Sequence, residues 1–175
     1  MPITFHTDRL TLTPFAEADL AQVHRMFTDP FVRKYLWDDI AVPEDQVADI
    51  LRVNDMLMRK RRFGLWKILR SADQQAIGFA GLWYFFEEPL PQLIYGLMPD
   101  FTGEGFATEA AAQIVDYAFG ELDFPHLLAA TDPPNTASSA VLARLGMTHL
   151  ETVDKAGKPT EVWELQRSSR RDSAD

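Results

Sequence analysis

The 175-residue sequence contains no cysteine. This absence excludes a disulfide scaffold, a zinc site with cysteine ligands and a covalent mechanism through a thiol. Histidine is also scarce, and the four residues lack the i, i+4 spacing that is typical of a metal site. We therefore expect no bound metal. The histidines are His6, His24, His126 and His149.

Long apolar runs and an excess of basic residues are missing too. The longest apolar stretch, 76–86, has eleven residues, whereas a membrane-spanning helix needs about 18 or more. The N-terminus has no basic segment followed by an apolar run, so it does not predict a signal peptide. With 26 acidic against 17 basic residues and a pI near 4.9, the chain lacks the charge that nucleic acid binding requires. We expect a cytoplasmic protein without nucleic acid or membrane partners.

The sequence does contain enough apolar material for a packed core, since 46% of its residues are hydrophobic and 11% are aromatic. Its length fits one domain. We expect this domain to span residues 1–167 and the remaining residues, 168–175, to form a flexible tail. The one dense basic run, 59–62 (RKRR), is typical of the solvated end of a helix.

Hydrophobic periodicity predicts alternating helices and strands. Strands are expected at 7–15, 63–70, 76–86, 93–98, 127–131, 147–154 and 159–166. Helices are expected at about 20–29, 43–58, 105–119 and 135–145, and a loop or broken helix at 31–42. This order predicts an α/β fold with a single mixed, mostly antiparallel sheet of about six to seven strands.

The segment 99–110 (PDFTGEGFATEA) links a predicted strand to a predicted helix. Gly103 and Gly105 allow a tight turn that leaves main-chain N–H groups unpaired at a helix N-terminus, which is a favourable place for an anion. The segment lacks the Gly-Lys-Ser/Thr ending of a P-loop and the third glycine of a Rossmann fingerprint. Taken alone, a tight turn without any ligand explains this motif equally well.

A second segment, 132–147 (DPPNTASSAVLARLGM), changes this balance. The two segments, in this order and separation, resemble the GNAT superfamily of acyl-CoA-dependent N-acyltransferases, especially the branch of ribosomal-protein N-terminal acetyltransferases. The resemblance extends over nearly the whole chain, from TDRLTLTPFAEADL through IGFAGLW and GEGFATEA to NTASSAVLARLGM. It implies helices on both faces of the sheet and a splay between strands 93–98 and 127–131.

The resemblance also implies acetyl-CoA as cosubstrate. The pantetheine arm would lie between the splayed strands, held by main-chain groups of Leu97 and Met98, and an N–H group there would polarise the thioester carbonyl. The family often has Gln or Arg where this chain has Asp100, so we expect no phosphate contact from that side chain. Main-chain amides of the turn would bind the pyrophosphate, and they belong to Gly103, Glu104, Gly105, Phe106, Ala107 and Thr108.

Three residues of the second segment receive roles from the resemblance. Asn135 would contact the pantetheine arm or order the substrate loop, although it is equally well explained as a helix N-cap. Many family members have a tyrosine seven residues later that protonates the leaving thiolate, but this chain has Leu142 there. The closer branch implies Ser138 as the acid instead. Arg144 would meet the CoA phosphates or lie on a solvated helix face.

Without a cysteine, a primary amine has to attack the thioester directly in a ternary complex. Four carboxylates are candidate bases, and each is equally an ordinary surface acid: Glu87, Glu88, Asp38 and Asp39. Four aromatic residues form either a pocket wall or part of the core: Tyr35, Trp37, Trp83 and Phe85. Glu109, early in a helix, suits the helix dipole and is expected to be structural.

These observations predict an acetyl-CoA-dependent N-acetyltransferase that is a monomer or a homodimer. The acceptor is a protein N-terminal α-amine or a small-molecule amine. Two other functions are compatible with the sequence: a CoA-binding sensor or scaffold without turnover, and a nucleotide-phosphate binder without acyl chemistry.

Overall fold

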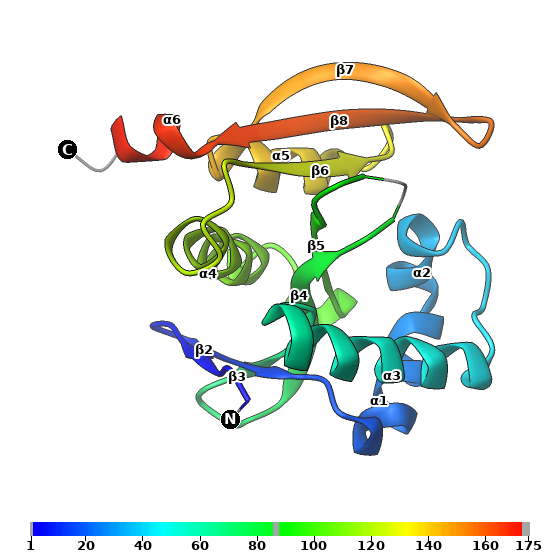
Figure 1. Ribbon diagram of the computed structural model, residues 1–175. Helices are drawn as coiled ribbons and strands as arrows, with labels where there is room; N and C mark the ends of the chain where they lie inside the picture. The colour runs from blue at the N-terminus through cyan, green and yellow to red at the C-terminus, as the bar shows by residue number, and fades with distance from the viewer. Residues whose placement is uncertain (1, 86–87, 173–175) are drawn as a thin grey trace.

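The computed structural model describes residues 2–85 and 88–172 of the chain. Within them, eight strands form one sheet in the order β1-β2-β3-β4-β5-β6-β8-β7 (Figure 1). The β5–β6 pair is parallel and the others are antiparallel. The strands are β1 (Phe5–His6), β2 (Leu10–Pro14), β3 (Leu65–Arg70), β4 (Ala76–Trp83), β5 (Gln92–Leu97), β6 (His126–Thr131), β7 (Thr148–Lys155) and β8 (Lys158–Gln166). The predicted α/β class and mostly antiparallel sheet are confirmed.

The strand that the prediction missed is β1, at the edge of the sheet. It has only two residues, with Phe5 opposite Leu12 and His6 opposite Thr11. A strand this short contains no complete alternation of apolar and polar residues, so periodicity does not detect it.

The helical elements connect the strands. They are η1 (Glu17–Asp19), α1 (Leu20–Thr28), α2 (Pro30–Leu36), α3 (Glu44–Arg61), η2 (Pro99–Phe101), α4 (Phe106–Gly120), α5 (Thr136–Arg144) and α6 (Arg167–Asp172). The described part of the predicted tail thus begins in a short helix, α6. In the described residues no helix has the length and apolar character needed to cross a membrane.

The helix α2 lies in the segment predicted as a loop or broken helix. Asp29 and Pro30 indicate the end of α1, but they also begin a new helix. The Asp29 carboxylate accepts hydrogen bonds from the N–H groups of Phe31, at 2.9 Å, and Val32, at 3.3 Å, and proline is well suited to the first helical position. The irregular part of the segment is therefore only the stretch between Leu36 and Glu44.

Alternate residues of β3 and β4 face two different cores. Leu65 and Phe79 pack with α1, α2 and α3. Trp66 and Ile68 point to the opposite face and pack with α4. The implied arrangement of helices on both faces of the sheet is visible in Figure 1, where α1 and α3 lie beside the half of the sheet that contains β2 to β4.

A buried asparagine fixes α3 against the sheet. Asn54 is fully buried, and its amide nitrogen donates to the carbonyl oxygens of Phe15 and Leu65, both at 3.2 Å. Its side-chain oxygen accepts from the Leu65 N–H at 2.6 Å. A Cβ atom on Gly64 would lie 2.3 Å from that oxygen, so only glycine fits beside it. These bonds set where β3 begins and which of its residues face each core.

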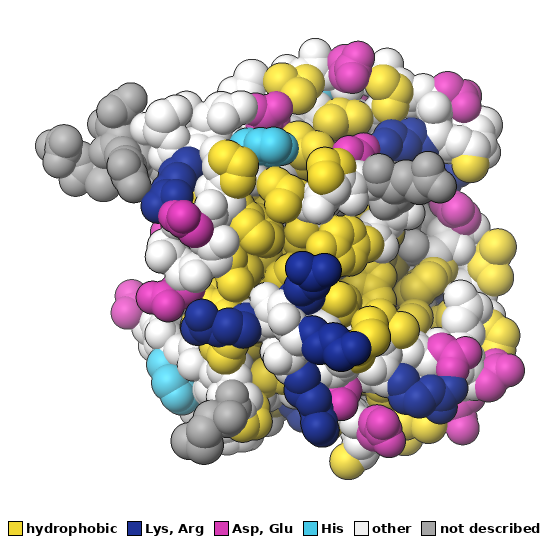
Figure 2. Space-filling model, viewed as in Figure 1, with side chains coloured by type: hydrophobic (Ala, Val, Ile, Leu, Met, Phe, Trp, Pro, Cys, Tyr) yellow, Lys and Arg dark blue, Asp and Glu magenta, His cyan; other side chains and the backbone are white. Residues whose placement is uncertain are grey.

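The basic run 59–62 occupies the end of α3, as predicted. Arg59 forms an ion pair with Asp55, one turn earlier, at 2.9 Å, and Arg62 ends the helix in the left-handed conformation, with φ of 63°. In the view of Figure 2, Lys and Arg side chains gather below an apolar area in the middle of the molecule. The run is part of a solvated surface, and its charges suit the C-terminal end of the helix dipole.

Candidate active site

The site is built around a split in the middle of the sheet. The parallel strands β5 and β6 share one pair of opposed residues, Gln92 and Leu128, and separate beyond it. A cavity of about 330 Å³ opens between them. The segment after β5 leads through η2 into α4, and the segment after β6 leads into α5, so both helices begin at the open end of the split (Figure 1).

The main chain of β5 presents an unpaired edge to this split. Met98 lies beyond the end of β5, and its N–H donates to the carbonyl of Ile77 at 2.8 Å, on the β4 side. Main-chain groups alternate in direction along an antiparallel strand, so those of Tyr95 and Leu97 point away from β4 and toward β6. Because β6 has already separated, these groups are available to an extended ligand.

This geometry corrects the prediction for the N–H group of Met98. Its N–H is used by Ile77, and its carbonyl accepts from the Phe101 N–H at 3.1 Å. The Met98 N–H is therefore not available to a ligand, whereas its carbonyl oxygen has a second lone pair and stays a predicted contact. Leu97 stays a predicted contact, and Tyr95 presents the same kind of edge nearer to the cavity.

The turn before α4 is a row of main-chain donors. Gly103 and Gly105 adopt positive φ angles of 80° and 82°, which directs the chain sharply into the helix. The Glu109 N–H donates to the Gly105 carbonyl at 3.0 Å, so the N–H groups of residues 106–108 precede the first internal bond of the helix. The buried Thr108 hydroxyl has no hydrogen-bond partner among the described residues. A bound phosphate oxygen would satisfy the main-chain N–H groups.

An arginine from the start of the chain supports the turn. The Arg9 guanidinium donates to the Glu104 carbonyl at 2.9 Å and lies 4.4 Å from the centre of the Phe106 ring. It also forms an ion pair with Glu109 at 2.7 Å. Arg9 therefore contacts residues before and after the row of main-chain donors at 103–108, which we call the donor row, and it places a positive charge beside them. Sequence reasoning missed this role.

Glu109 connects α4 to the β1–β2 turn, and its structural assignment agrees with this position. The carboxylate accepts from the Thr7 hydroxyl at 2.6 Å and from the Arg9 N–H at 2.9 Å. Burial alone would raise the pKa of Glu109, but these hydrogen bonds and the Arg9 charge outweigh it and lower the pKa below its ordinary value. Glu109 is thus held as a charged anchor.

The cavity wall nearest to α5 contains Asn135, Ser138, Leu142 and Tyr95. Asn135 caps α5, because its side-chain oxygen accepts from the Ser138 N–H at 3.2 Å. Tyr95 reaches across from β5, and its hydroxyl donates to the Ser138 carbonyl at 2.8 Å and lies 2.9 Å from the Ser138 hydroxyl oxygen. Burial raises the pKa of Tyr95 to about 12, against a smaller opposing effect of the Ser138 hydrogen bond.

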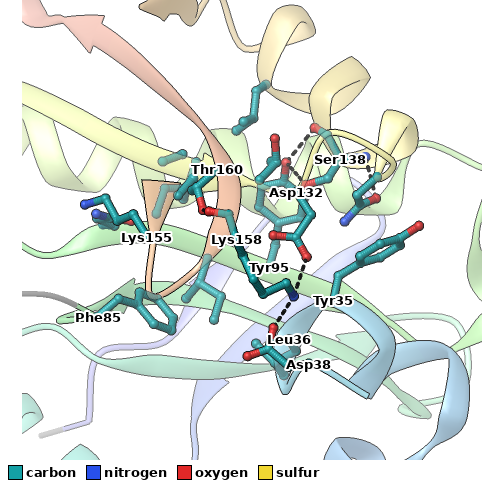
Figure 3. Close-up of a pocket in the computed structure, with 18 of the residues that line it drawn as sticks. Tyr35, Leu36, Asp38, Phe85, Tyr95, Asp132, Ser138, Lys155, Lys158 and Thr160 are labelled. Carbon is teal, nitrogen blue, oxygen red and sulfur yellow. Dashed lines mark hydrogen bonds and ion pairs between the residues drawn. The ribbon is translucent and has the colours of Figure 1, made fainter. Parts of the chain in front are cut away.

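Charged residues surround the opposite side of the cavity. Figure 3 shows the Lys158 side chain extending toward Asp38, while Asp132 lies on the other side of its ammonium group. Lys158 pairs with Asp38 and contacts Asp132 at 3.4 Å. The hydrogen bond that Lys158 donates to the Asp38 carboxylate, reinforced by the nearby Asp132 carboxylate, raises the pKa of Lys158. The Lys155–Glu88 ion pair, at 3.5 Å, adds a second link at this rim.

Comparison with known proteins assigns the chain to a family. The family model described as "Acetyltransferase (GNAT) domain" matches residues 9–148, which is most of the chain. The chain belongs to the GNAT acetyltransferase family. The predicted resemblance and the predicted enzyme class, N-acetyltransferase, are both confirmed.

Individual relatives of this GNAT protein agree with the assignment. FsC-acetyl coenzyme A-N(2)-transacetylase from Aspergillus fumigatus is 32% identical over 169 residues, which cover 85% of this chain and 66% of that protein. The chain thus spans just under two thirds of that relative. An acetyltransferase from Agrobacterium tumefaciens str. C58 is 24% identical with a TM-score of 0.82 and 94% of each chain covered. The ribosomal L7/L12 α-N-protein acetyltransferase RimL, in complex with coenzyme A, is 15% identical with a TM-score of 0.80, covering 94% of this chain and 98% of that one.

The GNAT fold brings together only part of the predicted site. Asn135, Ser138, Tyr35, Phe85 and Asp38 line the cavity. Among the other predicted bases, Glu88 lies at the rim, Asp39 pairs instead with Arg33 at 3.1 Å, and Glu87 falls outside the described residues.

Three other predicted residues lie away from the cavity. Trp37 and Trp83 pack against the core of α1 to α3 and do not line it. Arg144 is exposed on α5, without an ion pair to another described residue. Asp132 is the acidic lining residue that sequence reasoning did not single out, although it directly follows β6 in the DPPN run. Among the described residues, no cluster of His, Cys, Asp or Glu could hold a metal ion.

Proposed function

We propose that the protein transfers the acetyl group of acetyl-CoA to a primary amine by direct attack in a ternary complex. The observation that carries this proposal is the succession of three features along the split: the donor row at 103–108, the open edge of β5 and the cavity beside Ser138. A diphosphate, an extended amide-containing arm and a thioester fit these three features in that order.

The turn suits the CoA diphosphate because it supplies main-chain donors and the positive charge of Arg9. A Cβ atom built on Gly103 has no other atom within 4 Å, so the space above the turn is open. The pantetheine amides would pair with the main chain of Tyr95 and Leu97, as an added strand pairs with a sheet edge. This places the thioester near Ser138 and Asn135.

In this arrangement the acceptor approaches from the side of Asp38 and Asp132. Its ammonium first gives a proton to a carboxylate or to water, and the free amine then attacks the thioester carbon. A main-chain N–H of β5 stabilises the oxyanion, the C–N bond forms and the C–S bond breaks. The sulphur leaves as a thiolate, and Ser138 lies on the wall that would face it.

The names of two relatives support nitrogen as the acceptor atom. One is an N(2)-transacetylase that uses acetyl coenzyme A, and the other is an α-N-protein acetyltransferase. The acceptor is either a protein N-terminal α-amine or a small-molecule amine. The rim of the cavity has both carboxylates and lysines, and this mixture does not select one class of amine over the other.

The test combines turnover and binding. The protein is mixed with acetyl-CoA, a thiol reagent and a panel that contains N-terminal peptides, amino acids and polyamines, and thiol release is followed with and without each amine. Amine-dependent release together with a mass increase of the amine supports the proposal. CoA binding without release in any arm would indicate a sensor, and preference for ATP over CoA would indicate a nucleotide binder.

A further inference from the structure

A tyrosine lies where it can orient the hydroxyl that faces the leaving sulphur. Tyr95 comes from β5 and Ser138 from the first turn of α5, so 43 residues separate them along the chain. Both line the cavity at the split. Leu142, which stands where many GNAT enzymes have a tyrosine, is fully buried and lies one helical turn after Ser138. A phenol therefore reaches the same wall of the cavity from a different element.

We propose that Tyr95 is a positioning residue that holds the Ser138 hydroxyl toward the leaving thiolate of CoA. This inference rests on the proposed function. The side-chain oxygen of Asn135 accepts from the N–H of Ser138 and so fixes the main chain of Ser138. The hydroxyl of Tyr95 contacts the hydroxyl of Ser138 and so fixes its side chain. Without Tyr95, the Ser138 hydroxyl could rotate among acceptors.

The hydrogen bonds of the pair allow two arrangements of the same two protons. In the resting arrangement Tyr95 donates to the Ser138 carbonyl, and the Ser138 hydroxyl donates to the Tyr95 oxygen. When a thiolate forms, Ser138 donates to sulphur and Tyr95 turns its proton to the Ser138 oxygen. The Ser138 carbonyl keeps its ordinary helical partner in α5. The change therefore exchanges the Tyr95 bond to the Ser138 carbonyl for a Tyr95 bond to the Ser138 hydroxyl oxygen, and it leaves the helical bond of that carbonyl in place.

Neither residue loses its proton in this step. Burial keeps the phenol of Tyr95 neutral, with a pKa of about 12, so a thiolate whose conjugate thiol has a pKa near an ordinary value of about 8.5 does not deprotonate it. The electron pair of the broken C–S bond goes to sulphur, and the proton that the amine nitrogen releases restores the thiol. Ser138 and Tyr95 contribute a directed hydrogen bond to the developing negative charge.

The first experiment measures the pKa of the CoA thiol bound to the protein. Ultraviolet difference titration of the CoA complex against the desulpho-CoA complex reports thiolate formation without any acceptor amine. We expect a bound thiol pKa below that of free CoA in the wild type. In Tyr95→Phe and in Ser138→Ala it should return toward the free value, and the double variant should show no further change.

The matched control is Tyr117→Phe. The Tyr117 hydroxyl also donates to a main-chain carbonyl, that of Arg62, at 2.7 Å, but it lies on α4 outside the cavity. This variant loses a comparable hydrogen bond and should keep the wild-type thiol pKa. In turnover, Tyr95→Phe should reduce kcat about tenfold while KM for acetyl-CoA stays within about twofold.

The outcomes separate this inference from the proposed function. A wild type that does not bind CoA overturns both. A wild type that binds CoA and acetylates amines, together with a Tyr95→Phe variant of unchanged thiol pKa and unchanged kcat, overturns the role of Tyr95 alone. Should phenylalanine loosen α5, 3-fluorotyrosine at position 95 keeps the shape and makes the hydroxyl a stronger donor. It should lower the bound thiol pKa further, and an unchanged value would overturn the inference.

Discussion

Gly105→Val tests where the coenzyme diphosphate binds. Gly105 has φ of 82° and ψ of 6°, a left-handed conformation that is unfavourable for residues with a Cβ atom and worst for β-branched ones. The strain should lower the free energy of unfolding by about 1–3 kcal/mol. The new Cβ would meet only the Arg9 guanidinium, at 3.4 Å, so the substitution displaces no core side chain. The variant should fold.

The substitution should also weaken CoA binding, by an amount that is separate from its effect on stability. A hydrogen bond to a charged group contributes about 1.5–3 kcal/mol. If the valine side chain blocks one main-chain donor from the diphosphate, this loss corresponds to about 10- to 100-fold weaker binding. Isothermal titration calorimetry with CoA measures the change directly, and urea unfolding measures the stability cost in the same samples.

Gly146→Val is the matched control. Gly146 has φ of 85°, and its nearest contact for a new Cβ is a Leu165 methyl group at 3.9 Å. It follows the end of α5, away from the donor row, so it shares the strain without the proposed ligand. Wild-type CoA affinity in folded Gly105→Val, or equal weakening in Gly146→Val, would refute the placement of the diphosphate.

Substitutions at three further residues probe this turn and the start of α5. Arg9→Ala removes the donor to the Glu104 carbonyl, and steady-state kinetics should show a KM for acetyl-CoA about tenfold higher with kcat nearly unchanged. Glu109→Gln should be less stable than wild type at pH 7. Because the folded pKa of Glu109 is lowered, this difference should persist above about pH 4.3 and disappear as the pH falls through the folded pKa, whereas a difference that grows on acidification in urea unfolding would contradict it. Asn135→Ala should cost about 1 kcal/mol in the same assay, and Asn135→Ser, which keeps a capping oxygen, should recover most of it.

Much of the fold could be predicted because its signals are local. The alternation in β3 and β4 and the apolar stripe of α4 each depend on neighbours within a few residues. The donor row at 103–108 was predictable for the same reason, since two glycines before a helix determine which N–H groups have no internal acceptor. The helix α2 was harder, because the same Asp-Pro pair ends one helix and begins the next.

The side-chain parts of the site depend on pairing between distant segments. Arg9 reaches the donor row because β2 and α4 lie side by side, although 95 residues separate it from Glu104. The direction of the Met98 N–H follows from the register of β5 against β4, which no local pattern specifies. Lys158 and Asp38 meet across 120 residues. Periodicity can place each of these residues on an element, but not beside its partner.

The pair of Tyr95 and Ser138 shows how this affects the assignment of function. The resemblance to the family leads one to expect a tyrosine at position 142, where this chain has leucine. In three dimensions a phenol is present at the same cavity wall, supplied by β5 and bonded to the preceding turn of α5. Since hydrogen-bond donation depends on the position of the hydroxyl and not on the strand or helix that carries it, the missing tyrosine at position 142 does not by itself favour a non-catalytic sensor. The bound thiol pKa distinguishes a directed donor from a structural contact at this position.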